Sequence, residues 1–145
     1  MYFVDREKIK ACLTYFEQQI TLFETTNEWR TLIEKAALER ITHMIIESLL
    51  DIGNDMIDGF IMRDPGSYVD IIDILTDEKV ISIEMSASLK KVIAYRKILV
   101  QRYTEISHSQ LQADFRTALP LLKKLPPMIH AYLHNQLGPV SAFKN

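Results

Sequence analysis

Cysteine, glycine and proline are all scarce in this sequence, and each shortage excludes a class of protein. The single cysteine, Cys12, cannot form a disulfide within the chain, which excludes a disulfide-stabilised secreted scaffold. Four glycines and five prolines among 145 residues exclude collagen-like and low-complexity chains. Cys12 falls in an apolar helical pattern, so we expect a reduced, buried thiol and a cytoplasmic protein.

The sequence also lacks a long hydrophobic run. No stretch approaches the roughly 20 apolar residues that span a bilayer, and charges interrupt the first ten residues, where a signal peptide needs an apolar core. We therefore expect no contact with a membrane. With 48% hydrophobic and 25% charged residues, residues 1–145 have the composition and length of one globular domain.

Hydrophobic residues recur at helical spacing along nearly the whole chain, and no alternating strand pattern competes with them. The sequence therefore predicts an all-α fold, an antiparallel bundle of about five helices. The expected elements are a helix from the cap Asp5 to the polar run 24–28, a long helix from about Thr31 to 58–59, a short helix that follows a capping box at Ser67 and Asp70 and stops near Lys79, a helix from about Ser82 to about Ile106, and a last region from Ser109 that bends or restarts at Pro120 and Pro126–Pro127.

Acidic residues are missing from one long stretch of the chain. Residues 85 to 104 contain none, whereas five basic residues fall there: Lys90, Lys91, Arg96, Lys97 and Arg102. The formal net charge of the whole chain is −2, so overall charge cannot hold a nucleic acid. If the protein binds a polyanion, this stretch is where we expect the contact.

Arg96 lies at the centre of an apolar helical stripe. At 100° per residue, its neighbours on the same side are Leu89, Val92, Ile93, Leu99, Val100 and Tyr103. Removing water from an unpaired guanidinium costs several kcal/mol, so Arg96 needs an anionic partner. One interpretation is an ion pair with the acidic strip of the long helix, made by Glu47, Asp51, Asp55 and Asp58. The other is a cleft or dimer interface in which Arg96 and Tyr103 meet phosphate.

Two stretches of the sequence resemble a known family. They are ALERITHMIIESLLDIGNDMIDG, residues 37–59, and PGSYVDIIDILTDEKVISIEMSASLKKVIAYRKILVQRY, residues 65–103. Both are similar to the HepT-like branch of the HEPN superfamily, and most closely to its YutE type, over roughly residues 5 to 107. The resemblance implies a small all-α homodimer of the toxin-antitoxin kind, often paired with a minimal nucleotidyltransferase.

The family's signature is Arg-Asn, three residues that are usually apolar, His, any residue and Tyr. This sequence keeps Arg96 and Tyr103 but has Lys97 in place of the asparagine and Gln101 in place of the histidine. In the family, the arginine and the histidine are held to cleave RNA without a metal, at a site shared by two subunits. Because glutamine cannot exchange a proton, the resemblance implies a weakened or lost ribonuclease.

The resemblance also assigns roles to the neighbouring residues. Lys97, Arg102 and Lys90 would add positive charge for RNA or another phosphate ligand. In related pairs the nucleotidyltransferase transfers AMP to the tyrosine at the position of Tyr103, so this residue is a candidate modification site. A phosphate there would occupy the anion site beside Arg96. Glu47, Asp51 and Asp55 are the expected counter-charges.

The remaining histidines and carboxylates are less informative. His108 follows Arg102 at a spacing that fits a loose arginine-histidine pattern, and His43 lies on an apolar helix, where a core or boundary histidine is the usual reading. His130 and His134 lack a third metal ligand nearby. The strip that contains Asp51 and Asp55 could attract a divalent cation, but a solvated strip or counter-charges explain it as well. We therefore expect no metal and no cofactor.

These observations favour a cytoplasmic HepT-like homodimer that binds RNA or another phosphate ligand around Arg96 and Tyr103, with weakened or lost ribonuclease activity. One alternative is a non-catalytic module of the same fold that binds a nucleotidyltransferase partner or a nucleotide. Another is a purely structural bundle in which Arg96 is buried against Asp51 or Asp55.

Overall fold

The computed structural model describes residues 2–138, and every regular element in that range is helical. The elements are α1 (Arg6–Thr25), α2 (Leu32–Gly59), α3 (Tyr68–Asp77), α4 (Ile83–Gln101), the 3₁₀ helix η1 (Tyr103–Glu105), α5 (His108–Leu122) and α6 (Leu125–Leu137). The all-α prediction is confirmed. The last predicted region is two helices, so the described residues contain six α-helices instead of about five.

The helices begin where side chains can accept the free backbone N–H groups of a first turn. Asp5 accepts from Lys8 N at 3.0 Å, and Thr31 forms a complete capping box with Glu34. Ser67 accepts from Asp70 N at 3.1 Å, as the sequence predicts, but the Asp70 carboxylate bonds to Gly66 N at 2.8 Å. The predicted capping box at α3 is therefore only half formed.

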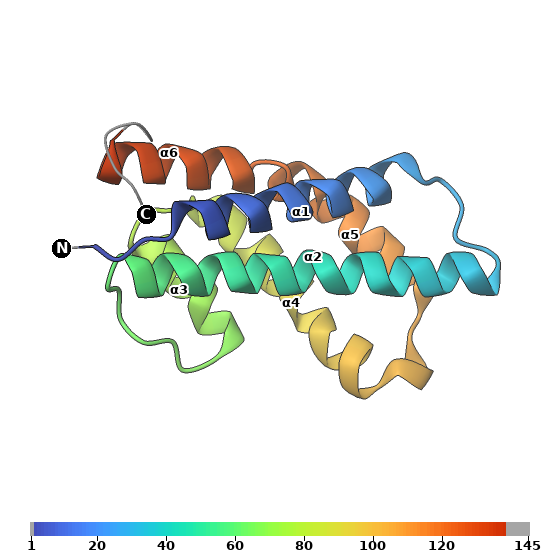
Figure 1. Ribbon diagram of the computed structural model, residues 1–145. Coiled ribbons are helices and arrows are strands. Elements are labelled where there is room, and N and C mark those ends of the chain that lie inside the picture. Colours follow the sequence, from blue (N-terminus) through green and yellow to red (C-terminus); the bar gives the residue numbers. More distant parts are fainter. Residues whose placement is uncertain (1, 139–145) are drawn as a thin grey trace.

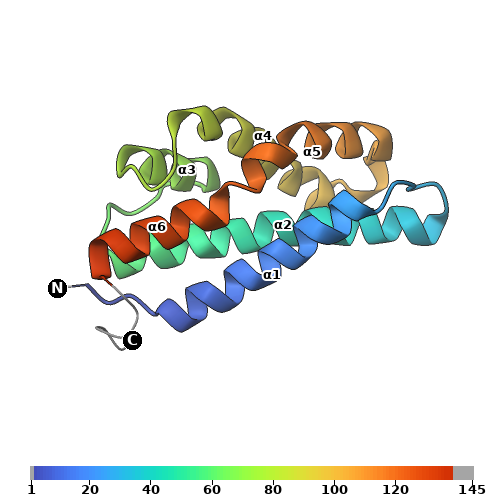
Figure 2. The same ribbon diagram turned by 90° about the horizontal axis from the view of Figure 1, so that it is seen from above.

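Helix α2 is the centre of the molecule. It runs antiparallel to α1 and also packs against α3, α4 and α5, while α6 lies against α1 (Figures 1 and 2). This position explains the broad apolar arc that the sequence shows on α2, because the helix is buried on most of its sides. The arc includes the fully buried Leu38, Ile45, Leu49, Ile52 and Met56.

Helix α4 ends five residues earlier than the sequence predicts. Arg102 N donates to Ile98 O in the last turn, and Arg102 itself leaves the helical region at φ −122° and ψ 43°. The chain must turn at this point because Ile106 packs back against the core and Ser107 caps α5. The C-terminal turns of α4 and η1 project below α2 in the view of Figure 1.

The prolines near the C-terminus act as the sequence predicts. Pro126 and Pro127 occupy the first turn of α6, where a missing N–H group leaves no hydrogen bond unmade. Pro120 lies in the last turn of α5, and the chain restarts after Lys123 and Lys124. The tail of the sequence after Gly138 lies outside the described residues.

Gly53 allows α2 and α3 to approach closely. A Cβ atom at this position would lie 2.5 Å from Cγ2 of Ile71, which is 2% exposed and cannot swing into solvent. The close contact sets the angle at which α3 leaves the bundle, and α3 carries Tyr68 at its first position. Glycine at this position therefore helps to place a residue that contacts Arg96.

We predict that Gly53→Ala lowers the midpoint of thermal unfolding by roughly 3 °C, a net loss of about 1 kcal/mol. Overpacking a core costs about 1–3 kcal/mol, and the better helix propensity of alanine offsets about 1 kcal/mol. Gly66→Ala is the matched control, because the nearest heavy atom to its Cβ would be 3.8 Å away. Equal midpoints for the two variants would contradict the close packing of α2 on α3.

Candidate functional site

Arg96 lies between α4 and α2, with its guanidinium paired to a carboxylate of its own chain. Its Nε lies 2.6 Å from Oε1 of Glu47, and each of the two side chains is 27% exposed. Glu47 is therefore the anionic partner that the sequence predicts for Arg96, and it replaces water that the guanidinium loses on burial. The arginine is nevertheless open to solvent, so it is not the sealed core arginine of a purely structural bundle.

The ring of Tyr68 covers one face of the Arg96 guanidinium. The guanidinium carbon lies 4.6 Å from the ring centroid, a cation–π geometry that restricts the side chain. Only Nε of Arg96 has a hydrogen-bond partner among residues 2–138. The two terminal amino groups therefore remain available to an anion in an orientation that Glu47 and Tyr68 hold.

A histidine shares the carboxylate that holds Arg96. His43 Nε2 lies 3.2 Å from the same Oε1 of Glu47, one turn earlier on α2. Oε1 of Glu47 thus joins His43 and Arg96 in one network. The histidine is 28% exposed at its side chain, so solvent and small ligands can reach it.

A second histidine and carboxylate pair lies further along the same face of α2. His108, the first residue of α5, places Nε2 at 2.7 Å from Oε2 of Glu39. One residue of each pair, Glu39 and His43, lines a cleft of about 230 Å³ together with Ala36, Arg40 and Leu99. His43 and His108 are far apart in the sequence, but in the structure His43 lines this cleft and His108 bonds to Glu39 at its wall.

Tyr103 does not share a helix with Arg96, and this corrects the sequence analysis. The expectation of a tyrosine two turns further along the same stripe assumes that α4 continues to about Ile106. Because α4 ends at Gln101, Tyr103 lies on η1 and is 66% exposed. Gln101 is also exposed, so both motif positions face outward from the end of α4.

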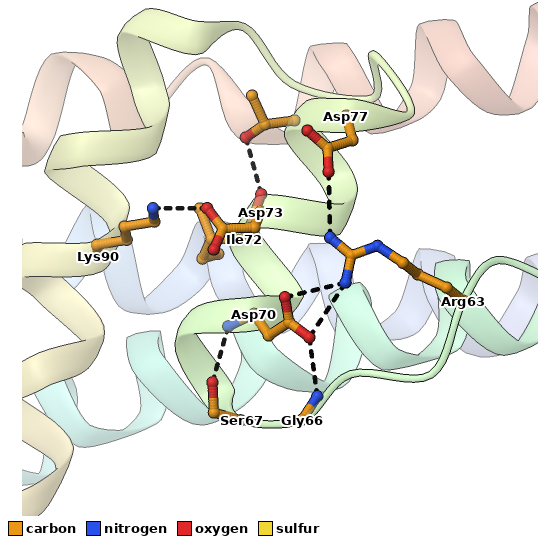
Figure 3. Close-up of polar contacts among 9 residues, drawn as sticks. Arg63, Gly66, Ser67, Asp70, Ile72, Asp73, Asp77 and Lys90 are labelled. Carbon is orange, nitrogen blue, oxygen red and sulfur yellow. Dashed lines mark hydrogen bonds and ion pairs between the residues drawn. The ribbon is translucent and has the colours of Figure 1, made fainter.

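Much of the basic stretch is neutralised by neighbouring helices. Lys90 pairs with Asp73 of α3 at 2.6 Å, and Lys91 pairs with Asp114 of α5 at 3.2 Å (Figure 3 shows the first pair). Lys97 and Arg102 are exposed and have no ion pair among the described residues. Lys90, a predicted phosphate-binding residue, is thus paired with a carboxylate, whereas Lys97 and Arg102 remain without one among the described residues.

Helix α3 is tied to the preceding loop by Arg63. Its guanidinium bonds to Asp70 at 3.0 and 3.2 Å and to Asp77 at 3.1 Å, so one side chain spans both ends of the helix (Figure 3). The hydrogen bond from Gly66 N, together with Arg63, lowers the pKa of Asp70. This network holds α3 in the position that sets Tyr68 against Arg96.

The rest of the acidic strip on α2 faces away from Arg96. Asp55 pairs with Lys8 of α1 at 3.1 Å, and Asp51 has no ion pair in the range 2–138. Burial, and then the nearby charges of Glu47 and Asp55, raise the pKa of Asp51. Of the three expected counter-charges, only Glu47 contacts Arg96.

The same strip does not assemble a metal site. Within residues 2–138, no three histidine, cysteine or acidic side chains are placed to hold a metal ion. In addition, none of the helices in that range is long and apolar enough to cross a bilayer.

The stripe Glu39, His43 and Glu47 is the feature that the sequence analysis missed. These residues are four apart, so they share one face of α2. Their spacing can be seen in the sequence, but the acidic residues 47, 51 and 55 have the same spacing. Spacing alone therefore does not distinguish the two stripes. Only the packing of α4 and α5 shows which of the two stripes forms a site.

A comparison with protein families matches residues 7–129 to the family described as "Ribonuclease HepT-like". A curated relative from Bacillus subtilis (strain 168), named "Putative RNase YutE", is 53% identical over 144 residues, which are 99% of this chain and 100% of the relative.

Two solved structures share the fold. The structure of YutE from Bacillus subtilis, described as a cytosolic protein of unknown function, has a TM-score of 0.95 at 52% identity and covers 99% of this chain and 100% of its own. A toxin-antitoxin crystal structure with AMP-PNP has a TM-score of 0.72 at 17% identity. That match covers 86% of this chain and 96% of the other, and it shows similarity of fold alone.

We predict that Arg96 and Glu47 stabilise the fold as a pair. In a double-mutant cycle with Arg96→Gln and Glu47→Gln, we expect a coupling of about 1 kcal/mol from urea unfolding, because both side chains are partly buried. A cycle of Arg96→Gln with Asp55→Asn is the control and should show no coupling, since Asp55 pairs with Lys8 instead. Equal coupling energies in the two cycles would mean that the contact between Arg96 and Glu47 does not itself stabilise the fold.

Proposed function

The chain belongs to the HepT-like ribonuclease family, and from this premise we propose that it binds RNA or another phosphate ligand at a dimer cleft around Arg96. The observation that supports the proposal is the fixed orientation of the Arg96 guanidinium. Glu47 and Tyr68 hold the guanidinium, and its terminal amino groups have no partner among residues 2–138. A planar guanidinium held in this orientation can donate two hydrogen bonds to the oxygens of one phosphate group.

Two further cations extend the proposed binding surface. Lys97 and Arg102 are exposed and have no ion pair in the described part of the chain. Lys97 lies near the end of α4, where Gln101 is the last residue, and Arg102 links α4 to Tyr103 at the start of η1. A phosphate backbone that reaches Arg96 along this end would meet both cations, which supports RNA as the ligand.

Dimerisation is part of the proposal because one subunit is weakly acidic overall. With a net charge of −2, a polyanion is attracted only where basic residues gather, and a two-fold axis near the end of α4 would bring two copies of them together. Val100 and Tyr103, at this end, are 38% and 66% exposed. Exposed apolar surface on a projecting helix suits an interface between two subunits.

Cleavage through the family's histidine is weakened or lost in this proposal. Gln101 stands at the histidine position and cannot take a proton from a 2′-hydroxyl. The loss of a general acid or base lowers a rate by about 10²- to 10⁴-fold. Arg96 would still bind the phosphate and stabilise developing charge.

The alternative is a non-catalytic module of the same fold, which binds a nucleotidyltransferase partner or a nucleotide. The exposure of Tyr103, 66% on a short 3₁₀ helix, favours a contact with a second protein. The same exposure would let a partner transfer AMP to the hydroxyl. In either case we place the protein in the cytoplasm, like the relative that is described as cytosolic.

We predict that Arg96→Ala weakens binding of a short single-stranded RNA by about tenfold or more in fluorescence anisotropy at low salt, because it removes the oriented guanidinium. Leu22→Ala, on an exposed part of α1, is the matched control and should bind normally. Gln101→His should increase RNA cleavage above that of the unaltered chain. Unchanged binding by Arg96→Ala would refute the proposed site.

We also predict that the protein elutes as a dimer, at twice 16.8 kDa, when its mass is measured by light scattering. Val100→Glu should shift the mass to the monomer and weaken RNA binding, since a carboxylate at the interface would be desolvated and would repel phosphate. Leu22→Glu places the same charge on α1 and should leave the dimer intact. If the unaltered protein has the mass of a monomer, the proposed cleft between two subunits is refuted.

A further inference from the structure

Two histidines are each held by a glutamate of α2 near Arg96: His43 lines the cleft, and His108 bonds to Glu39, which lines it as well. His43 lies 3.2 Å from Glu47, and His108 lies 2.7 Å from Glu39. Glu39 and His43 line the cleft together with Arg40. Each histidine side chain is less than one third exposed, at 28% and 23%, so both are ordered by the fold and still reachable.

The two glutamate carboxylates determine which imidazole nitrogen of each histidine can accept or give a proton. A carboxylate can only accept, so Nε2 of each histidine must donate its proton to the glutamate. In the neutral ring the lone pair is then on Nδ1, and in the charged ring Nδ1 carries the second proton. Nδ1 has no hydrogen-bond partner among residues 2–138 in either ring, which leaves it free to exchange a proton.

We propose that His43 and His108 perform the proton transfers for RNA cleavage at this cleft, in place of the histidine that Gln101 replaces. This inference rests on the proposed binding of RNA around Arg96. It goes beyond that proposal because it assigns the acid and the base to α2 and α5, and not to the family's position on α4. Glu39 and Arg40 line the cleft with His43, and Oε1 of Glu47 joins His43 to Arg96.

The reaction is a transesterification that needs one base and one acid. Neutral His43, which shares Glu47 with Arg96, takes the proton of the ribose 2′-hydroxyl. The 2′-oxygen forms a bond to phosphorus, and Arg96 stabilises the charge on the phosphoryl oxygens. The bond from phosphorus to the 5′-oxygen breaks as protonated His108 gives its proton to that oxygen. The products are a 2′,3′-cyclic phosphate and a 5′-hydroxyl end, so atoms, protons and charge balance.

The test compares His43→Gln and His108→Gln with the unaltered chain on labelled single-stranded RNA, with EDTA present. Glutamine can still donate a hydrogen bond to the glutamate, so a merely structural histidine would be replaced without loss. His130→Gln, an exposed histidine on α6, is the matched control. Arg96→Ala purified in parallel gives the background rate. Binding is measured separately with 2′-deoxy oligonucleotides of the same sequence, which cannot react.

We expect slow cleavage by the unaltered chain, with a bell-shaped pH profile of the rate and cyclic phosphate ends. In each glutamine variant, the cleavage rate above background should fall by about 10²-fold or more, or to the detection limit. The pH profile of any remaining rate should rise or fall on one side only, since one of the two titrating groups is missing. Binding to the 2′-deoxy oligonucleotide and thermal stability should stay close to those of the unaltered chain.

Two results would overturn the inference and leave the proposed function standing: RNA that is bound but not cleaved, or cleavage that survives in both glutamine variants. Absence of binding by the unaltered chain would instead overturn the proposed function itself, and the inference with it. Loss of cleavage in His130→Gln as well would show that the rate follows the stability of the fold, which also overturns the inference.

Discussion

The ion pair between Arg96 and Glu47 is the interaction on which the rest of the site depends. A guanidinium inside an apolar helical stripe is tolerated only when an acceptor replaces its water. Glu47 supplies that acceptor from helix α2, and the ring of Tyr68 lies over one face of the cation. The arginine is thus held by three helices at once, while its terminal amino groups stay open.

Placing this pair on α2 has consequences for the surrounding chemistry. Because α2 packs against four other helices, the stripe of Glu39, His43 and Glu47, which repeats every four residues along one face, is held in a fixed position. Helices α4 and α5 then each bring one group to it, Arg96 and His108. A site built on helices positions its groups more closely than one built on loops. Asp73 of α3 and Asp114 of α5 pair with Lys90 and Lys91, which lie outside the stripe.

The protein keeps the family's arginine and tyrosine but not its histidine, and the structure gives this difference a physical meaning. At the end of α4, Gln101, Arg102 and Tyr103 are exposed. His43 and His108 are less exposed and bond to glutamates of α2. We propose that phosphate binds at Arg96 and the exposed end of α4, whereas the two histidines beside α2 transfer the protons.

The sequence by itself determined most of the fold, because helical periodicity, caps and prolines act between residues close together in the chain. It predicted the starts of α1, α2 and α3 and the need of Arg96 for an anion. It placed the end of α4 wrongly, since that end is fixed by Ile106 packing on a distant core and not by any local breaker. Only the tertiary structure decided which carboxylate meets Arg96, that Lys90 is neutralised by Asp73, and that His108 bonds to Glu39 beside the cleft that His43 lines. Those pairings join residues on different helices, and a pattern along one helix cannot predict which face another helix will pack against it.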